Sequence, residues 1–143
     1  MKITLTNVRT KYQNLLALAD CHLPSKLAYG IAKNLSKLEK EVELIEKQRK
    51  SMLESYAQKD ETGTFIIENG NYALGENLNI FCKEFDEFLQ TETEIHIHKC
   101  PCGVLDMLDD PRYENLTPTQ MLVLDFMLEQ KENSENDKEV DTQ

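Results

Sequence analysis

The chain of 143 residues has no tryptophan and is poor in glycine and proline, with five and four residues. These low counts exclude a collagen-like chain, and plentiful Leu, Ile, Val and Phe argue against broad disorder. No apolar run approaches the roughly 18 residues that a membrane span needs, so no membrane contact is expected. The N-terminus, residues 1–7, has one basic residue but no continuous apolar core, so no secretory signal is predicted.

Positive charge is also scarce, since 16 Lys and Arg stand against 26 Asp and Glu and the net charge is −10. This balance disfavours direct binding to nucleic acid, because phosphate contacts need clustered Lys and Arg. An acidic surface mostly serves solubility, but it also suits a basic protein partner or mimicry of a nucleic-acid surface.

The four cysteines are few and irregularly spaced, at Cys21, Cys82, Cys100 and Cys102. Without a secretory signal the expected compartment is the cytosol, where disulfides do not persist, and the spacing is not that of a disulfide framework. Cys82 lies within a helical apolar pattern, which predicts a small buried side chain.

The clearest feature of the chain is a long helix predicted from Pro24, which suits the first helical turn, to about Tyr56. Its apolar residues are spaced by three and four, as in a coiled-coil seam, and its opposite face is strongly charged. A helix of this length needs a partner helix, in this chain or another. The seam comprises Leu27, Ile31, Leu35, Leu38, Val42, Ile45, Met52 and Tyr56.

The segments before and after the long helix predict a small β-hairpin and further helices. Residues 2–5 alternate as a short strand, and Thr6 or Asn7 then caps a helix that runs to about Asp20. Asn69-Gly70 is a strong hairpin signal between two β-prone runs. A helix from about Glu76 to Thr91 is expected to fold back antiparallel on the C-terminal half of the long helix.

The C-terminal part of the chain predicts one more strand and one more helix. Residues 93–99 alternate, so this strand can pair with residues 2–5 and bury the isoleucines at 95 and 97. Thr117 begins a capping box with Pro at the first helical position, and the helix is expected to reach about Gln130. The acidic segment after residue 130 has one aliphatic residue and is predicted to be mobile.

Together these elements predict a mainly α fold with minor β structure: a long helical hairpin, or coiled-coil-like stalk, with a β-hairpin at its tip and a small α/β base. We expect one domain over residues 1–130, with the stalk over 24–91 and the base formed by 1–23 and 92–130. Residues 131–143 form the predicted tail.

One cluster of potential metal ligands is present: His96, His98, Cys100 and Cys102. Imidazole and thiolate are the usual zinc donors, and side chains two apart share a face of a strand. Four donors in line cannot surround an ion tetrahedrally, so the turn at Pro101 would have to bring Cys102 around. A zinc site is therefore one hypothesis, and an exposed strand face followed by a turn is the other.

Signals for catalysis are weak in this sequence. There is no Gly-x-Ser-x-Gly, no local Cys/His signature and no glycine-rich phosphate loop. The Asp residues at 106, 109 and 110 lack the spacing of a calcium loop. We therefore expect a protein that is not an enzyme and has no cofactor, apart from the zinc hypothesis.

Several stretches carry a family resemblance: residues 23–34 (LPSKLAYGIAKN), 56–63 (YAQKDETG), 92–98 (ETEIHIH), 116–121 (LTPTQM) and 124–127 (LDFM). Together these resemble a group of small uncharacterised proteins encoded by tailed bacteriophages and prophages of Gram-positive bacteria. The resemblance covers most of the chain except the acidic tail. It implies a viral or prophage origin and the cytoplasm of the bacterial host, but no activity or site residues.

The leading functional hypothesis is a non-enzymatic, phage-encoded protein-interaction module with a phage or host partner. An alternative is an acidic inhibitor of a host nucleic-acid or defence enzyme, and another is a small zinc-binding protein. If the seam is not filled within the chain, a homodimer follows, because an exposed stripe of this kind would not stay hydrated. The expected interaction surface comprises Ile31, Leu35, Leu38, Val42, Ile45 and Met52 of the long helix with Met121, Leu124 and Leu128.

Overall fold

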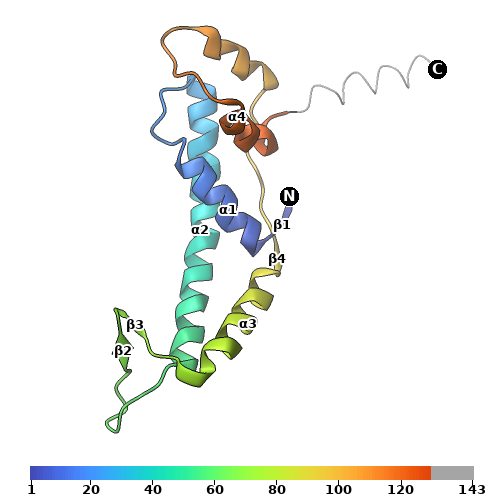
Figure 1. The fold of residues 1–143 in the computed structure, drawn as a ribbon. Helices are drawn as coiled ribbons and strands as arrows, with labels where there is room; N and C mark the ends of the chain where they lie inside the picture. Colours follow the sequence, from blue (N-terminus) through green and yellow to red (C-terminus); the bar gives the residue numbers. More distant parts are fainter. Residues whose placement is uncertain (130–143) are drawn as a thin grey trace, which may run out of the picture.

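The computed structural model describes residues 1–129 and is mainly helical, as predicted (Figure 1). The predicted tail, residues 131–143, lies outside the described part. Three segments of 3₁₀ helix (η) accompany the α-helices in residues 1–129. The order is β1 (Lys2–Thr4), α1 (Leu5–Leu16), α2 (Ser25–Tyr56), β2 (Ile67–Glu68), β3 (Asn71–Tyr72), η1 (Gly75–Asn77), α3 (Leu78–Leu89), β4 (Glu92–Glu94), η2 (Cys102–Asp109), α4 (Pro118–Leu124) and η3 (Asp125–Met127).

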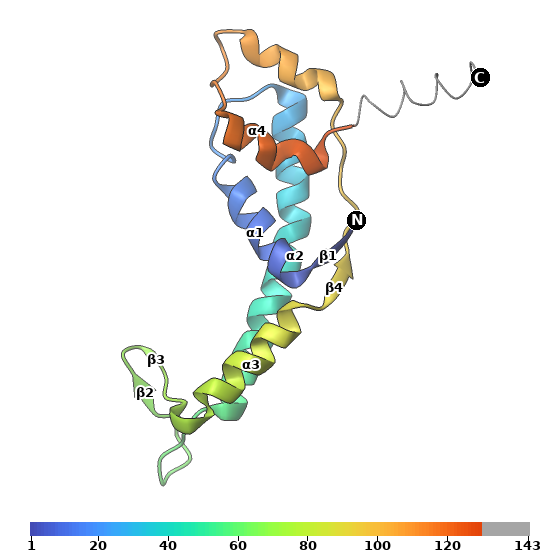
Figure 2. The ribbon, with the colours of Figure 1, turned by 45° about the vertical axis from the view of Figure 1, so that its right-hand side comes forward.

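The long helix α2 is the axis of the molecule, and its predicted extent is confirmed. Pro24 stands at its N-cap, where the missing N–H costs nothing. The 32 residues span roughly 48 Å at 1.5 Å per residue. Both ribbon views show α1 beside the upper half of α2 and α3 running back along the lower half (Figures 1 and 2). The predicted antiparallel α2–α3 pairing is therefore present.

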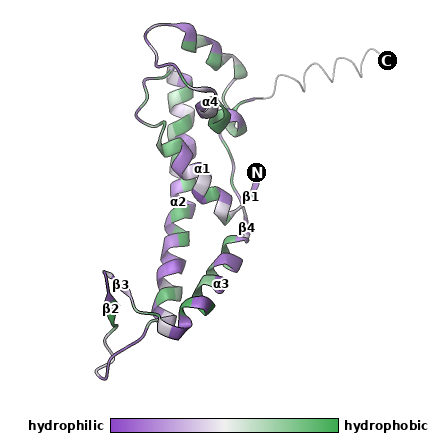
Figure 3. Cartoon of the chain, in the orientation of Figure 1, coloured by the Kyte–Doolittle hydropathy of each residue, from purple (hydrophilic) through white to green (hydrophobic). Residues whose placement is uncertain are grey.

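The apolar stripe of α2 is covered by other parts of the same chain. Leu27, Ile31, Leu38 and Ile45 are each at most 2% exposed and belong to one core that extends from Ile3 to Leu128. Hydrophobic residues recur along both α2 and α3 in Figure 3. The seam is thus filled within the chain, and a second copy is not needed to bury it.

The N-terminal strand passes directly into the first helix, which differs from the prediction. Thr4 caps α1, because its hydroxyl accepts a hydrogen bond from the Asn7 amide, so the helix begins at Leu5 and neither Thr6 nor Asn7 is the cap. The helix also ends at Leu16, short of Asp20. Strand β1 pairs antiparallel with β4.

The predicted hairpin lies at the lower end of α2 in both views (Figures 1 and 2). Its strands β2 and β3 pair antiparallel around Asn69 and Gly70. Both turn residues have positive φ, 52° and 79°, as a type I′ turn requires. Asn-Gly is the pair that adopts this conformation at least cost, which explains why the sequence signal was reliable.

The C-terminal helix is shorter than predicted, although its start is confirmed. Thr117 and Gln120 form the expected capping box. The helix then ends at Leu124 and a one-turn segment ends at Met127, so it does not reach Gln130. The reason is backbone pairing with Cys100, whose amide donates to the Met127 carbonyl and whose carbonyl accepts from the Glu129 amide.

Among residues 1–129, the helices include none that combines the length and the apolar character required to cross a lipid bilayer.

Candidate functional site

The His/Cys segment is an extended strap along α2 rather than the long strand predicted. Only Glu92–Glu94 pairs with β1; Ile95 still exchanges hydrogen bonds with Met1, and residues 96–99 follow without a neighbouring strand. The predicted burial of Ile95 and Ile97 is confirmed, at 4% and 8% exposed. These side chains enter the core together with Ile3 and Leu5.

Side chains of α2 take the place of a neighbouring strand for this strap. The Asn34 amide nitrogen donates to the His98 carbonyl at 3.0 Å, and its oxygen accepts from the His98 N–H at 2.8 Å. Lys37 donates to the His96 carbonyl at 2.6 Å. Asn34 is fully buried, so these bonds replace the water that both its polar atoms lose on folding.

The strap also approaches the α2 backbone closely at Gly30. A Cβ at this position would overlap the sulfur of Cys100 and would lie 3.0 Å from the Met127 methyl carbon. Cys100 donates through its thiol to the Lys26 carbonyl at 3.5 Å. Burial, with the Glu129 charge as a second cause, raises the pKa of Cys100, so its thiol stays protonated.

The four predicted metal ligands are not brought around one point. Cys100 is buried against α2, and His96 is exposed. Cys102 is the first residue of η2. His98 lies nearer Cys100, beside Gly30, but its ring contacts Tyr29 edge-on at 5.5 Å. Within residues 1–129 no three His, Cys, Asp or Glu side chains form a metal-binding group. His98 and Cys100 both approach Gly30, so these two lie on the same side of the strap, as predicted, whereas His96 is exposed.

The residues predicted as an interaction surface belong mostly to the core of the chain itself. Ile31, Leu38, Ile45, Met52, Leu124 and Leu128 are buried, and Leu35 and Val42 are partly buried against the same core. Of the nine, Met121 alone is exposed, at 38%. This assignment needs correction, because side chains already packed within the fold offer nothing to a partner.

Cys82 is a further correction, since it is exposed and not buried as predicted. On α3 the buried positions are Phe81 and Leu89, with Phe85 and Phe88 half-buried. The helix turns about 100° per residue, which carries Cys82 off the face that these aromatic side chains share.

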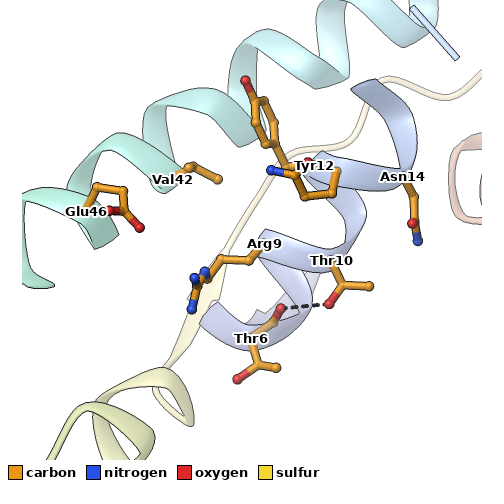
Figure 4. Close-up of a pocket in the computed structure, with 8 residues that line it drawn as sticks. Thr6, Arg9, Thr10, Tyr12, Asn14, Val42 and Glu46 are labelled. Atoms are coloured by element: carbon orange, nitrogen blue, oxygen red, sulfur yellow. Dashed lines mark hydrogen bonds between the residues drawn. The ribbon is translucent and has the colours of Figure 1, made fainter. Parts of the chain in front are cut away.

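A polar cleft of about 460 Å³ lies between α1 and α2 (Figure 4). Arg9 and Tyr12 of α1 lie on one side of it and Glu46 of α2 on the other. The Thr10 hydroxyl is already used, donating to the Thr6 carbonyl at 3.2 Å. The cleft offers one carboxylate and one guanidinium, with no histidine or thiol in its lining.

A larger groove of about 860 Å³ lies next to this cleft, toward the C-terminal end of α2, and Glu46 lines both. We call it the tip groove; it is formed by the C-terminal half of α2, the hairpin and the start of α3. Its inner side is apolar, with Leu74 and Phe81 buried and Leu53 half-buried. Its outer walls carry Ile67 and Leu78, which are 55% and 50% exposed.

The hairpin and α3 are fixed against α2 by hydrogen bonds that shape this groove. The Tyr72 hydroxyl donates to Glu54 at 3.1 Å, and the Tyr56 hydroxyl donates to Glu84 of α3. The bond to Glu84 is the main cause that raises the pKa of Tyr56. For Tyr72 the main cause of its raised pKa is burial, followed by the Glu54 carboxylate. The phenols therefore stay protonated as donors at neutral pH.

The edge of the tip groove along α2 is basic, which contrasts with the rest of the chain. Lys47, Arg49 and Lys50 line it, against a single lining carboxylate, Glu46. Glu46 contacts Arg49 at 3.7 Å. Lys47 and Lys50 are exposed and are in no ion pair within residues 1–129.

The tip groove was not predicted, because the sequence pattern marked the polar face of α2 only as strongly charged. The signal that was available is the run of three cations in four residues, 47–50, in a chain of net charge −10. The apolar side of the groove carried no local signal, because Ile67 and Leu78 come together with α2 only through the tertiary fold.

Comparison with known proteins gave no assignment: no protein-family profile, no curated protein and no solved structure matches this chain.

Proposed function

We propose that this chain is a non-enzymatic protein-interaction module that docks a partner at the tip of its long helix. The observation that supports the proposal most is the tip groove, where half-exposed Ile67 and Leu78 stand beside Lys47 and Lys50. Exposed apolar walls with a charged rim are typical of a protein-binding surface, because burial supplies affinity and the rim supplies orientation.

The rest of the fold acts as a rigid support for this end. The α2 stripe is buried against α1 and the strap, and the hydrogen-bonded Asn34 holds the strap in one register. A helix fixed in this way holds the hairpin and the start of α3 at a defined distance from the base. Binding sites on rigid elements lose less conformational entropy when a partner docks.

The resemblance to small proteins of tailed phages and prophages supports a viral origin and the bacterial cytoplasm as the place of action. Under this proposal the partner is a phage or host protein that meets the tip groove. The buried stripe of α2 takes no direct part in binding, since its side chains are already packed in the core.

The proposal is tested by site-specific cross-linking in bacterial cells that produce the protein. A photo-reactive amino acid replaces Leu78 in the tip groove or, as the matched control, Leu122, which is 75% exposed on α4. We expect one discrete cross-linked protein from position 78 and none from position 122. No cross-link at 78, or the same products at both positions, would contradict docking at the tip.

A further inference from the structure

The tip groove has two properties that together restrict its occupant. Its apolar part is lined by Leu53, Leu78 and Phe81 and is open to solvent, so it suits the apolar side chains of a segment that lies along it. Its cations, Lys47, Arg49 and Lys50, line one edge within about one turn of α2. A ligand that fills both parts must carry negative charge beside an apolar anchor.

We infer that the tip groove binds an acidic peptide segment of a partner protein, with a Leu- or Phe-type anchor seated between the hairpin and α3. The inference rests on the proposed function and specifies the chemistry of the partner. Lys47 and Lys50 face the acidic side chains, and Ile67 and Leu78 enclose the anchor. The supporting argument is charge complementarity at a locally basic edge of an acidic chain.

Nucleic acid also carries negative charge, but it fits this groove less well. Sequence-tolerant binding of single strands uses aromatic faces for base stacking. Here Phe81 is buried, and the Tyr72 ring packs edge-on against Phe65 at 5.1 Å. The net charge of −10 repels a long polyanion, whereas a short acidic segment brings few charges to the basic edge.

A second copy of the chain is a weaker candidate for the occupant. Its exposed carboxylates at Glu84, Asp86 and Glu87 lie on α3, and Glu84 is already paired with Tyr56. The apolar neighbours of that segment, Phe85 and Phe88, are packed against the core of their own chain. Residues 84–88 therefore offer charge but no free apolar anchor of their own.

The inference is tested with the full chain by fluorescence anisotropy. The probes are a labelled peptide rich in Asp and Glu that carries one Phe and one Leu, the same peptide with Lys at every acidic position, and a single-stranded DNA of similar length. We expect binding of the acidic peptide alone, and we expect it to weaken steeply as salt is raised.

Variants locate the binding and separate local from overall charge. Lys47→Glu with Lys50→Glu should weaken the acidic peptide by about tenfold or more, because two favourable exposed pairs become repulsive. The matched control, Lys26→Glu with Lys40→Glu, makes the same change in net charge on the same helix away from the groove, and should leave binding within about twofold. Leu78→Asp should abolish binding without unfolding the chain, since this side chain is half-exposed.

Several outcomes would overturn the inference. One is that the two double variants weaken binding of the acidic peptide equally. Another is that the DNA or the basic peptide binds more tightly than the acidic peptide. A third is self-association of the chain that the Lys47→Glu, Lys50→Glu variant removes. A partner cross-linked from position 78 while no acidic peptide binds would leave the proposed function standing and refute the acidic segment. Circular dichroism of each variant confirms that loss of binding is not loss of the fold.

Discussion

Replacing Asn34 with alanine should destabilise the whole protein, because this side chain substitutes for a missing β-strand. Asn34 is 0% exposed and makes two hydrogen bonds to the backbone of His98, at 2.8 and 3.0 Å. No other described side chain pairs with both the N–H and the carbonyl of one strap residue.

The magnitude follows from these two bonds and their surroundings. Each bond contributes about 1 kcal/mol, and a backbone group left unpaired in a dry site costs about 1–3 kcal/mol more. Because His98 is half-buried, water can satisfy part of the loss. We therefore expect the free energy of unfolding to fall by about 2–3 kcal/mol. For a chain of this size, that lowers Tm by roughly 10 °C.

Thermal unfolding followed by circular dichroism gives the Tm change, and hydrogen exchange gives its location. The exposed Ser36→Ala on the same helix is the control and should stay within about 0.5 kcal/mol of the unmodified protein. In Asn34→Ala the amide of His98 should exchange much faster than in the control. A Tm within about 2 °C of the unmodified protein, with unchanged exchange at His98, would refute the role of Asn34.

The remaining predictions concern the close approach at Gly30, the buried stripe and the thiols. Gly30→Ala should lower the free energy of unfolding by about 1–3 kcal/mol, because its Cβ meets the Cys100 sulfur. Adding Cys100→Ala should recover part of this loss in a double-mutant cycle. If the losses of the two single variants simply add in the double variant, the contact is contradicted. In chemical denaturation, Leu38→Ala should lower the free energy of unfolding by about 2–5 kcal/mol. Leu44→Ala, on the same helix but 61% exposed, should lower it by less than about 0.5 kcal/mol. Equal losses in the two variants would be inconsistent with the buried stripe. In thiol titration of the native protein, Cys82 should react quickly and Cys100 only on unfolding. Since Cys21 and Cys102 are partly exposed, the decisive variant has Ser at positions 21, 82 and 102, and a fast phase that survives in it would contradict the burial of Cys100. The folded state holds the Cys100 proton more tightly than the unfolded state, so the contribution of this proton to stability is present below a pH of about 8.5 and is lost as pH rises through the raised pKa. Cys100→Ala should therefore show a shallower decline in the free energy of unfolding at alkaline pH. A decline identical to that of the unmodified protein would contradict this.

Features governed by local sequence were predictable here. The spacing of Leu27, Ile31 and Leu38 indicated both the long helix and its buried face. The Asn69-Gly70 turn and the Thr117 capping box depend on neighbouring residues alone, so their signals survive in the fold. The pairing of β1 with β4 followed from two short alternating segments with matching apolar faces.

Features that depend on tertiary contacts were not predictable. Nothing in the helical pattern gave Asn34 a role, whereas in the structure its side chain pairs with His98 of the strap, 64 residues further along the chain. The end of α4 depends on Cys100, whose backbone forms hydrogen bonds with the backbones of Met127 and Glu129. The tip groove likewise exists only after the hairpin and α3 return to α2.

The mass of the full chain in solution tests most directly whether the apolar stripe of α2 is covered by the same chain, which leaves only the tip groove for a partner. Light scattering across a range of concentrations should give a constant 16.6 kDa, the mass of a single chain, because the stripe is covered by α1, α3 and the strap. A mass that stays near twice this value, and that falls with unfolding when Leu38 is replaced by Asp, would show that the stripe is buried between chains instead.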